Sequence, residues 1–384
     1  MTIYELRMKT EKVQMGLRVI ATLFISGFTS YVNGQSMTED YNECAIECFQ
    51  QKEYDSAIYF YTEIISMNPQ DENAYFDRGF VKDLIEDYDG AISDFTQQIA
   101  IDSEHVDSYF LRGMIWERKK EFTKAIQDYS SVIHLEDGNA DAHYFRGIIK
   151  ELMKDDQGAF IDYSDAIRVN PEHSDAYTHR AWIKIKQKDF LAAEKDLAIA
   201  LNIDSTNVQS YYYLGFIQAE NHSFDAAISN YLKAIRLNPF FELDYPIDEM
   251  KKHKLTDYTS ALKKLITNQK SSSTQGDLAL LFLYLNQIDQ AMVFCNNAIT
   301  FDTIDAKNFC FRSRIHLKRS KLLEALTDLN YAIELNPNNA LFYYKRALIY
   351  MSLGETKKAC SDYETEILLE GFAHWWILPS PCAN

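Results

Sequence analysis

The chain has 384 residues, of which 47% are hydrophobic and 14% aromatic, so it can bury a core and does not have a disordered composition. It contains only 13 glycines and 7 prolines, which suits helices joined by short turns. The net charge of −17 argues against nucleic acid as a partner and against broad attachment to an acidic membrane surface.

The N-terminal residues have the pattern of an export signal. From Met15 the chain reads MGLR, then the apolar run VIATLFISGF, and then reaches the compact residues Val32 and Gly34. The apolar run is too short to span a bilayer comfortably. We therefore predict a signal peptide over 1–34, with Met15 as a candidate for the true start of the chain, and a periplasmic, envelope-associated or secreted protein. The alternatives are an uncleaved anchor, which would give membrane association through this segment alone, and a helix of a cytoplasmic protein.

After this segment an alanine recurs every 34 residues over 57–227 and, after a break, again over 291–359. A small residue stands twelve positions before each of these alanines. A bulky residue, mostly aromatic, follows four positions later, and breakers such as Asn170-Pro171 end several units. Self-similarity at this period predicts a solenoid of helix pairs, in which each unit buries its apolar face against its neighbours. The alanines are Ala57, Ala91, Ala125, Ala159, Ala193, Ala227, Ala291, Ala325 and Ala359, and the small residues are Ala45, Gly79, Gly113, Gly147, Ala181, Gly215, Ala279, Ser313 and Ala347.

This pattern resembles the tetratricopeptide repeat (TPR). The resemblance covers six repeats over 38–241 and three repeats over 272–373. It implies an all-α, right-handed superhelical solenoid of antiparallel helix pairs. The departures are Gln275, where an aromatic residue is expected, and the residues that replace the terminal proline, which are Ser103, Asp137, Ser205, Thr303 and Gly371.

Two further segments complete the expected organisation. Residues 242–271 contain Ala261 and Leu265 at the repeat spacing, so they form either a degenerate repeat or a plain linker. Pro246 and the serines at 271–273 favour a bend there between the two arrays. The tail over 374–384 contains two tryptophans, which we expect to cap the last apolar face.

Six units carry an arginine just before the small residue, and the same six carry an aspartate sixteen positions later. Units that lack the arginine also lack the aspartate, and residues that vary together in this way usually touch. We predict structural ion pairs between helices, within a unit or across to the next one. The expected pairs are Arg78 with Asp94, Arg112 with Asp128, Arg146 with Asp162, Arg180 with Asp196, Arg312 with Asp328, and Arg346 with Asp362.

In tetratricopeptide proteins the first helices of successive repeats line a concave groove. That face is unusually aromatic and apolar here, which favours a groove for a peptide or protein segment. The alternative is that the same side chains pack as core between neighbouring first helices. The candidate groove residues are Phe76, Phe80, Phe110, Met114, Tyr144, Ile148, Trp182, Tyr212 and Phe216. Some family members hold a C-terminal carboxylate with lysine and asparagine, but four of these apolar residues occupy those places, so we do not expect that activity.

The sequence contains no catalytic motif, and Cys44 and Cys48 lack the further ligands that a metal site needs. We therefore expect a non-enzymatic scaffold or adaptor that binds a protein or peptide, with no cofactor, metal, nucleic acid or small-molecule substrate. The alternative is a permanent structural subunit of a cell-envelope assembly.

Overall fold

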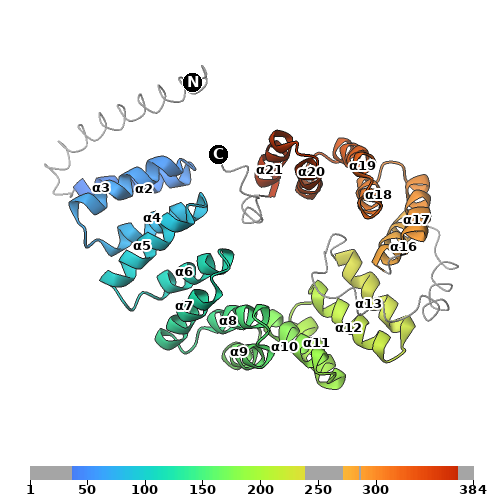
Figure 1. Ribbon diagram of the computed structural model, residues 1–384, viewed down its shortest axis with the longest axis horizontal. Coiled ribbons are helices and arrows are strands. Elements are labelled where there is room, and N and C mark those ends of the chain that lie inside the picture. The colour runs from blue at the N-terminus through green and yellow to red at the C-terminus, as the bar shows by residue number, and fades with distance from the viewer. Residues whose placement is uncertain (1–36, 238–270, 285–286, 371–384) are drawn as a thin grey trace, which may run out of the picture. The chain divides into compact units, whose positions relative to one another are not determined.

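A computed structural model describes residues 37–237, 271–284 and 287–370. Within these residues the chain forms eighteen helices and no strand (Figure 1). The first eight helices are α2 (Met37–Gln50), α3 (Tyr54–Met67), α4 (Glu72–Leu84), α5 (Tyr88–Ile101), α6 (Val106–Arg118), α7 (Phe122–Leu135), α8 (Ala140–Leu152) and α9 (Asp156–Val169).

The other ten helices follow the same alternation of a first and a second helix. They are α10 (Ser174–Lys186), α11 (Phe190–Ile203), α12 (Val208–Glu220), α13 (Phe224–Leu237), α16 (Ser272–Tyr284), α17 (Ile288–Phe301), α18 (Ala306–Lys318), α19 (Leu322–Leu335), α20 (Ala340–Ser352) and α21 (Thr356–Glu370). The nine expected helix pairs are therefore present, and the all-α repeat architecture is confirmed.

The chain divides into two compact units between Pro171 and Glu172. This boundary falls inside the six-repeat array expected over 38–241, between its fourth and fifth pairs, where the 34-residue period continues without a break. The export signal over 1–34, most of the segment 242–271 and the tail over 374–384 lie outside the described residues. The signal, the bend and the cap therefore stay predictions.

Within each unit a first helix packs against the second helix of its own pair, and that second helix packs against the next first helix. Small residues make the close approach possible. A Cβ atom on Gly147 would stand 2.7 Å from the Cε1 atom of Tyr163, and one on Gly215 would stand 2.6 Å from that of Tyr231. The two tyrosine rings therefore fill the space that the glycines leave, and both are buried.

Acidic residues begin many of the helices. Asp155 accepts a hydrogen bond from the backbone N–H of Gly158 at 2.9 Å, and Asp71 accepts one from Ala74 at 3.0 Å. Such caps satisfy N–H groups that the helix itself leaves unpaired.

The turn inside each described pair, apart from the pair of α16 and α17, contains one residue with positive φ, seven positions after the small residue. Only one of these eight is a glycine, Gly354, at φ +76°. The other seven are Lys52, Glu86, Lys120, Lys154, Lys188, His222 and Ser320, with φ between 58° and 65°. This left-handed residue reverses the chain between the two helices of a pair.

A candidate partner-binding face

The six expected Arg–Asp pairs all form, each between the two helices of one repeat. The arginine Nε donates to Oδ2 at 2.7–3.0 Å, and Nη2 donates to Oδ1 at 2.6–2.9 Å. Both oxygens of each carboxylate are therefore engaged by a planar fork. The aspartates are buried, which makes these pairs structural ties rather than a surface for a partner.

The same arginines also connect neighbouring repeats, which the sequence pattern did not reveal. In at least five of them Nη1 donates to a side-chain oxygen on the preceding second helix at 2.9–3.2 Å. The acceptor stands sixteen residues before the arginine, and it is Thr62, Thr96, Ser130, Asn296 or Asn330. A search for a recurring hydroxyl or amide at that offset would have found this contact.

The candidate groove residues of the first unit are half-buried, and Phe80 is 36% exposed. Phe76 contacts Phe95 and His105, with ring centroids 5.8 and 4.9 Å apart. Phe110 contacts Tyr129 at 5.7 Å. These side chains pack with one side on their own repeat and on the next one, where Phe110 also contacts Phe145 at 5.6 Å. They keep part of their surface open with the other side, so both interpretations of the face apply here.

The three candidates of the second unit are buried. Trp182, Tyr212 and Phe216 are only 5–6% exposed and belong to one hydrophobic cluster. The indole of Trp182 stacks on the ring of Tyr213 with centroids 5.1 Å apart and planes 13° apart. For these three residues the structure gives core packing, which was the alternative to the groove.

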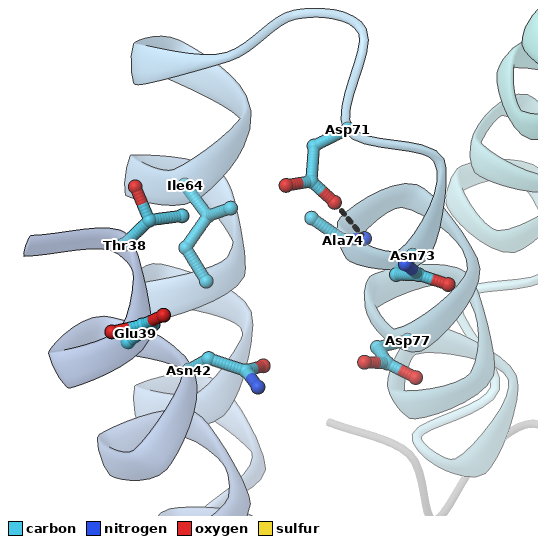
Figure 2. A pocket seen from close by; sticks show the side chains of 8 residues that line it. All are labelled: Thr38, Glu39, Asn42, Ile64, Asp71, Asn73, Ala74 and Asp77. Carbon is cyan, nitrogen blue, oxygen red and sulfur yellow. Dashed lines mark hydrogen bonds between the residues drawn. The ribbon is translucent and has the colours of Figure 1, made fainter. Parts of the chain in front are cut away.

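A hollow of about 430 Å³ opens between the first helices α2 and α4 (Figure 2). Thr38, Glu39 and Asn42 line its α2 side, and Asp71 and Asp77 face them from the α4 side. Ile64 of α3, Asn73 and Ala74 complete the lining. The hollow therefore presents three carboxylates and two amides around a small apolar floor.

Asp77 is a half-buried carboxylate of this hollow, as Asp71 is. Burial raises its pKa above the ordinary value, and the negative charge of Asp71 raises it further. The Asp77 side chain forms no hydrogen bond or ion pair with the described residues. By contrast, Asp83 and Asp94 of the same repeat have arginine partners at 2.7 Å. The sequence interpretation missed this site because it followed the apolar stripe of the first helices.

Among the described residues, His143, Asp162 and Asp165 have metal-ligand spacing, with their ligand atoms within 4.8 Å of one another. Both oxygens of Asp162 already accept hydrogen bonds from Arg146, and Lys150 lies 2.7 Å from Oδ2. A divalent ion would have to displace Lys150 and stand beside a guanidinium, which Coulomb repulsion opposes. Burial lowers the pKa of His143, so its imidazole is neutral at neutral pH. We interpret Asp162 and Asp165 as members of ion pairs, with Arg146 and with Arg168, and His143 as a buried neutral side chain beside them.

Cys44 and Cys48 are free thiols, and they belong to no potential metal cluster among the described residues. Burial raises the pKa of the Cys48 thiol to about 11. The thiol is therefore protonated at neutral pH, whereas a metal ligand needs the thiolate. Across the described part of the chain, no helix is long and apolar enough to cross a bilayer.

Comparisons with known proteins identify the repeats. Family models described as tetratricopeptide repeat and TPR repeat match residues 208–241 and 314–354. A tetratricopeptide repeat and J domain-containing co-chaperone, DNJ1 of Fusarium oxysporum f. sp. lycopersici, is 34% identical over 67 residues. That match covers 17% of this chain and only 13% of the relative.

Solved structures with a similar arrangement of helices share little sequence with this chain. MamA is 20% identical with a TM-score of 0.41, over 45% of this chain and 94% of its own. The pilF protein of Pseudomonas aeruginosa is 15% identical with a TM-score of 0.46, over 59% and 97%. YrrB, described as a TPR protein with an unusual peptide-binding site, is 17% identical with a TM-score of 0.41, over 47% and 93%.

The stacked helix pairs, with small residues facing aromatic rings and an open row on the first helices, define a helical repeat scaffold. With the two matching family models and the 34-residue period, they place this chain in the tetratricopeptide repeat family. Proteins of this family serve as protein-interaction scaffolds or co-chaperone adaptors, and the fold is generally non-enzymatic.

Proposed function

We propose that this protein is a non-enzymatic scaffold that holds a segment of a partner protein on the first helices of its first unit. The observation that carries this proposal is the row of half-buried aromatic and apolar side chains on α4, α6 and α8. Three of them, Phe80, Met114 and Ile148, occupy the same position in successive repeats. Aromatic residues and methionine are enriched in interfaces between proteins.

The row favours an extended or helical segment over a small ligand. Successive repeats present equivalent side chains at regular intervals, so a partner with apolar residues at matching intervals can contact several repeats together. The buried residues Trp182, Tyr212 and Phe216 would support the second unit instead of contacting this partner. Export of the chain by its first 34 residues is part of the proposal, and the partner would then share the exported compartment.

The test begins with capture of partners from separate cytosolic, envelope and secreted fractions by the immobilised chain. The affinity of the recovered partner is then measured for the native chain and for Phe80→Ala. We expect Phe80→Ala to weaken binding about fivefold or more, because loss of a partly exposed aromatic anchor costs about 1 kcal/mol or more at an interface. Recovery from the cytosolic fraction alone would contradict export.

Ile161→Ala provides the matched control. Ile161 lies on the second helix α9 of the same unit and is 51% exposed, outside the row. We expect this variant to bind like the native chain. Equal affinity for both variants and the native chain would reject the proposed face, provided that circular dichroism shows the three proteins equally folded. A partner that never dissociates would indicate a permanent structural subunit.

A further inference from the structure

We propose that the hollow between α2 and α4 binds a lysine or arginine side chain of the partner segment, with Asp77 as its counter-ion. This inference rests on the proposed function, because the hollow lies on the first helices of the same unit. It adds the chemistry of the partner, namely a basic segment with apolar residues beside its positive charge.

The charge of the surrounding repeats supports a basic partner. Residues 37–105 contain 17 aspartates and glutamates but only three lysines and arginines. Two of those three, Arg78 and Lys82, pair with the same carboxylate, Asp94. Asp83 and Asp89 have a cation of the following repeat beside them, Arg118 and Lys119. The seventeen acidic residues nevertheless leave this part of the first unit with an excess of negative charge. A surface of this kind attracts positively charged segments and raises their association rate.

The position of Asp77 within its repeat supplies a second argument. Asp77 stands two residues before Gly79, and Asp277 stands two residues before Ala279 in the second unit. Asp277 is buried, and it accepts a hydrogen bond from Nε of Arg236 at 2.7 Å. A carboxylate at this place in the repeat thus binds a guanidinium within the molecule itself, whereas the described chain supplies no cation to Asp77.

The lining of the hollow suits such a group. Figure 2 shows Asp77 and Asn42 facing each other across the space between α2 and α4, with Ile64 on the wall. An ammonium or guanidinium has only donors, and the carboxylates and the amide oxygens are acceptors. The methylene groups of the same lysine or arginine side chain can lie against the apolar floor.

The inference is tested with two synthetic fluorescent peptides of twelve residues, each containing two phenylalanines. One carries four lysines, and the other carries glutamines in their places. We expect the native chain to bind the lysine peptide about tenfold more tightly at low salt. Raising the salt to about 0.5 M should remove most of this difference, because the Debye length falls below about 5 Å.

Variants show which carboxylate is responsible for the preference for the lysine peptide. We expect Asp77→Asn to weaken binding of the lysine peptide about fivefold and to leave the glutamine peptide unchanged. Asp137→Asn is the matched control, because it makes the same change in charge at an exposed residue of the same unit, outside the hollow. Equal weakening by both variants would indicate a diffuse negative field and would overturn the site.

The remaining outcomes separate the two proposals. If both peptides bind alike and Phe80→Ala weakens both, the groove stands and the basic partner is wrong. If neither peptide binds and the captured partner is insensitive to Phe80→Ala and Asp77→Asn, both proposals fail. A rise in melting temperature with calcium chloride alone, abolished by Asp77→Asn, would assign the hollow to a divalent cation and overturn the inference.

Discussion

Among the single residues, each Arg–Asp ion pair joins a buried carboxylate to one or two cations. In three repeats a lysine four positions after the arginine provides the second cation, at 2.8 Å from Asp94, 2.7 Å from Asp162 and 2.6 Å from Asp196. At Asp128 that position is Trp116, and within the described chain Arg112 is the only cation in contact with this carboxylate. The buried aspartates therefore differ in how much their charge compensation depends on the arginine.

We predict that Arg112→Leu destabilises the protein more than Arg146→Leu does. Without Arg112 the buried Asp128 has no cation left, which costs about 3 kcal/mol or more. Without Arg146 the carboxylate of Asp162 keeps Lys150, so we expect a loss of about 1–2 kcal/mol. Urea unfolding followed by circular dichroism measures both free energies. The double variant Arg146→Leu with Lys150→Leu should approach the larger loss, and equal effects of the two single variants would contradict the role given to Lys150.

At the scale of elements, the turn inside each pair has a fixed backbone shape that most of the residues occupying it do not favour. Lys154 has φ +65°, and its N–H donates to the carbonyl of Glu151 at 2.9 Å, while the N–H of Asp155 donates to that of Lys150 at 2.8 Å. Left-handed backbone costs a residue with a side chain about 1 kcal/mol, and glycine adopts it without that cost. Packing of the two helices imposes the turn and offsets this cost.

We predict that Lys154→Gly and Gly354→Lys change stability in opposite directions. The first change relieves the left-handed strain and should stabilise by about 0.5–1 kcal/mol, after allowance for the greater freedom of glycine in the unfolded chain. The second introduces the strain and should destabilise by about 1 kcal/mol. Urea midpoints measure both, and Lys154→Ala is the control, since it keeps the strain and should be near neutral. A destabilising Lys154→Gly would show that the lysine side chain outweighs the backbone.

At the scale of the whole molecule, the same repeat position has two different roles. On α4, α6 and α8 the candidate groove residues keep part of their surface open, whereas on α10 and α12 Trp182 and Phe216 are buried. The second unit contains a large hydrophobic cluster with members on several helices from α10 to α18. In the second unit, these positions on the first helices therefore contribute to stability. The equivalent positions of the first unit keep surface open for a partner.

We predict that Trp182→Ala lowers the free energy of unfolding by about 3–5 kcal/mol, because it leaves a cavity beside Tyr213. Binding of the partner should be unchanged at a temperature where the variant is folded. Phe80→Ala should show the reverse pattern, with a small loss of stability and a clear loss of affinity. Thermal melts and binding isotherms on the same samples separate the two, and a Trp182→Ala variant as stable as the native chain would refute the assignment to the core.

The helix pairs, their period and the Arg–Asp contacts could be predicted from the sequence, because each follows from a local spacing that recurs from repeat to repeat. The sequence did not determine the division at Pro171, the burial of Trp182 or the exposure of Phe80, because those depend on which neighbouring surfaces meet. The acidic hollow also depends on packing: Asp77 and Asn42 are 35 residues apart, and only the packing of α2 and α4 on α3 brings them to one opening. The recurring residues specify the structure of one repeat. The residues that differ between repeats are assigned to the core or to an open surface only when the helices are stacked.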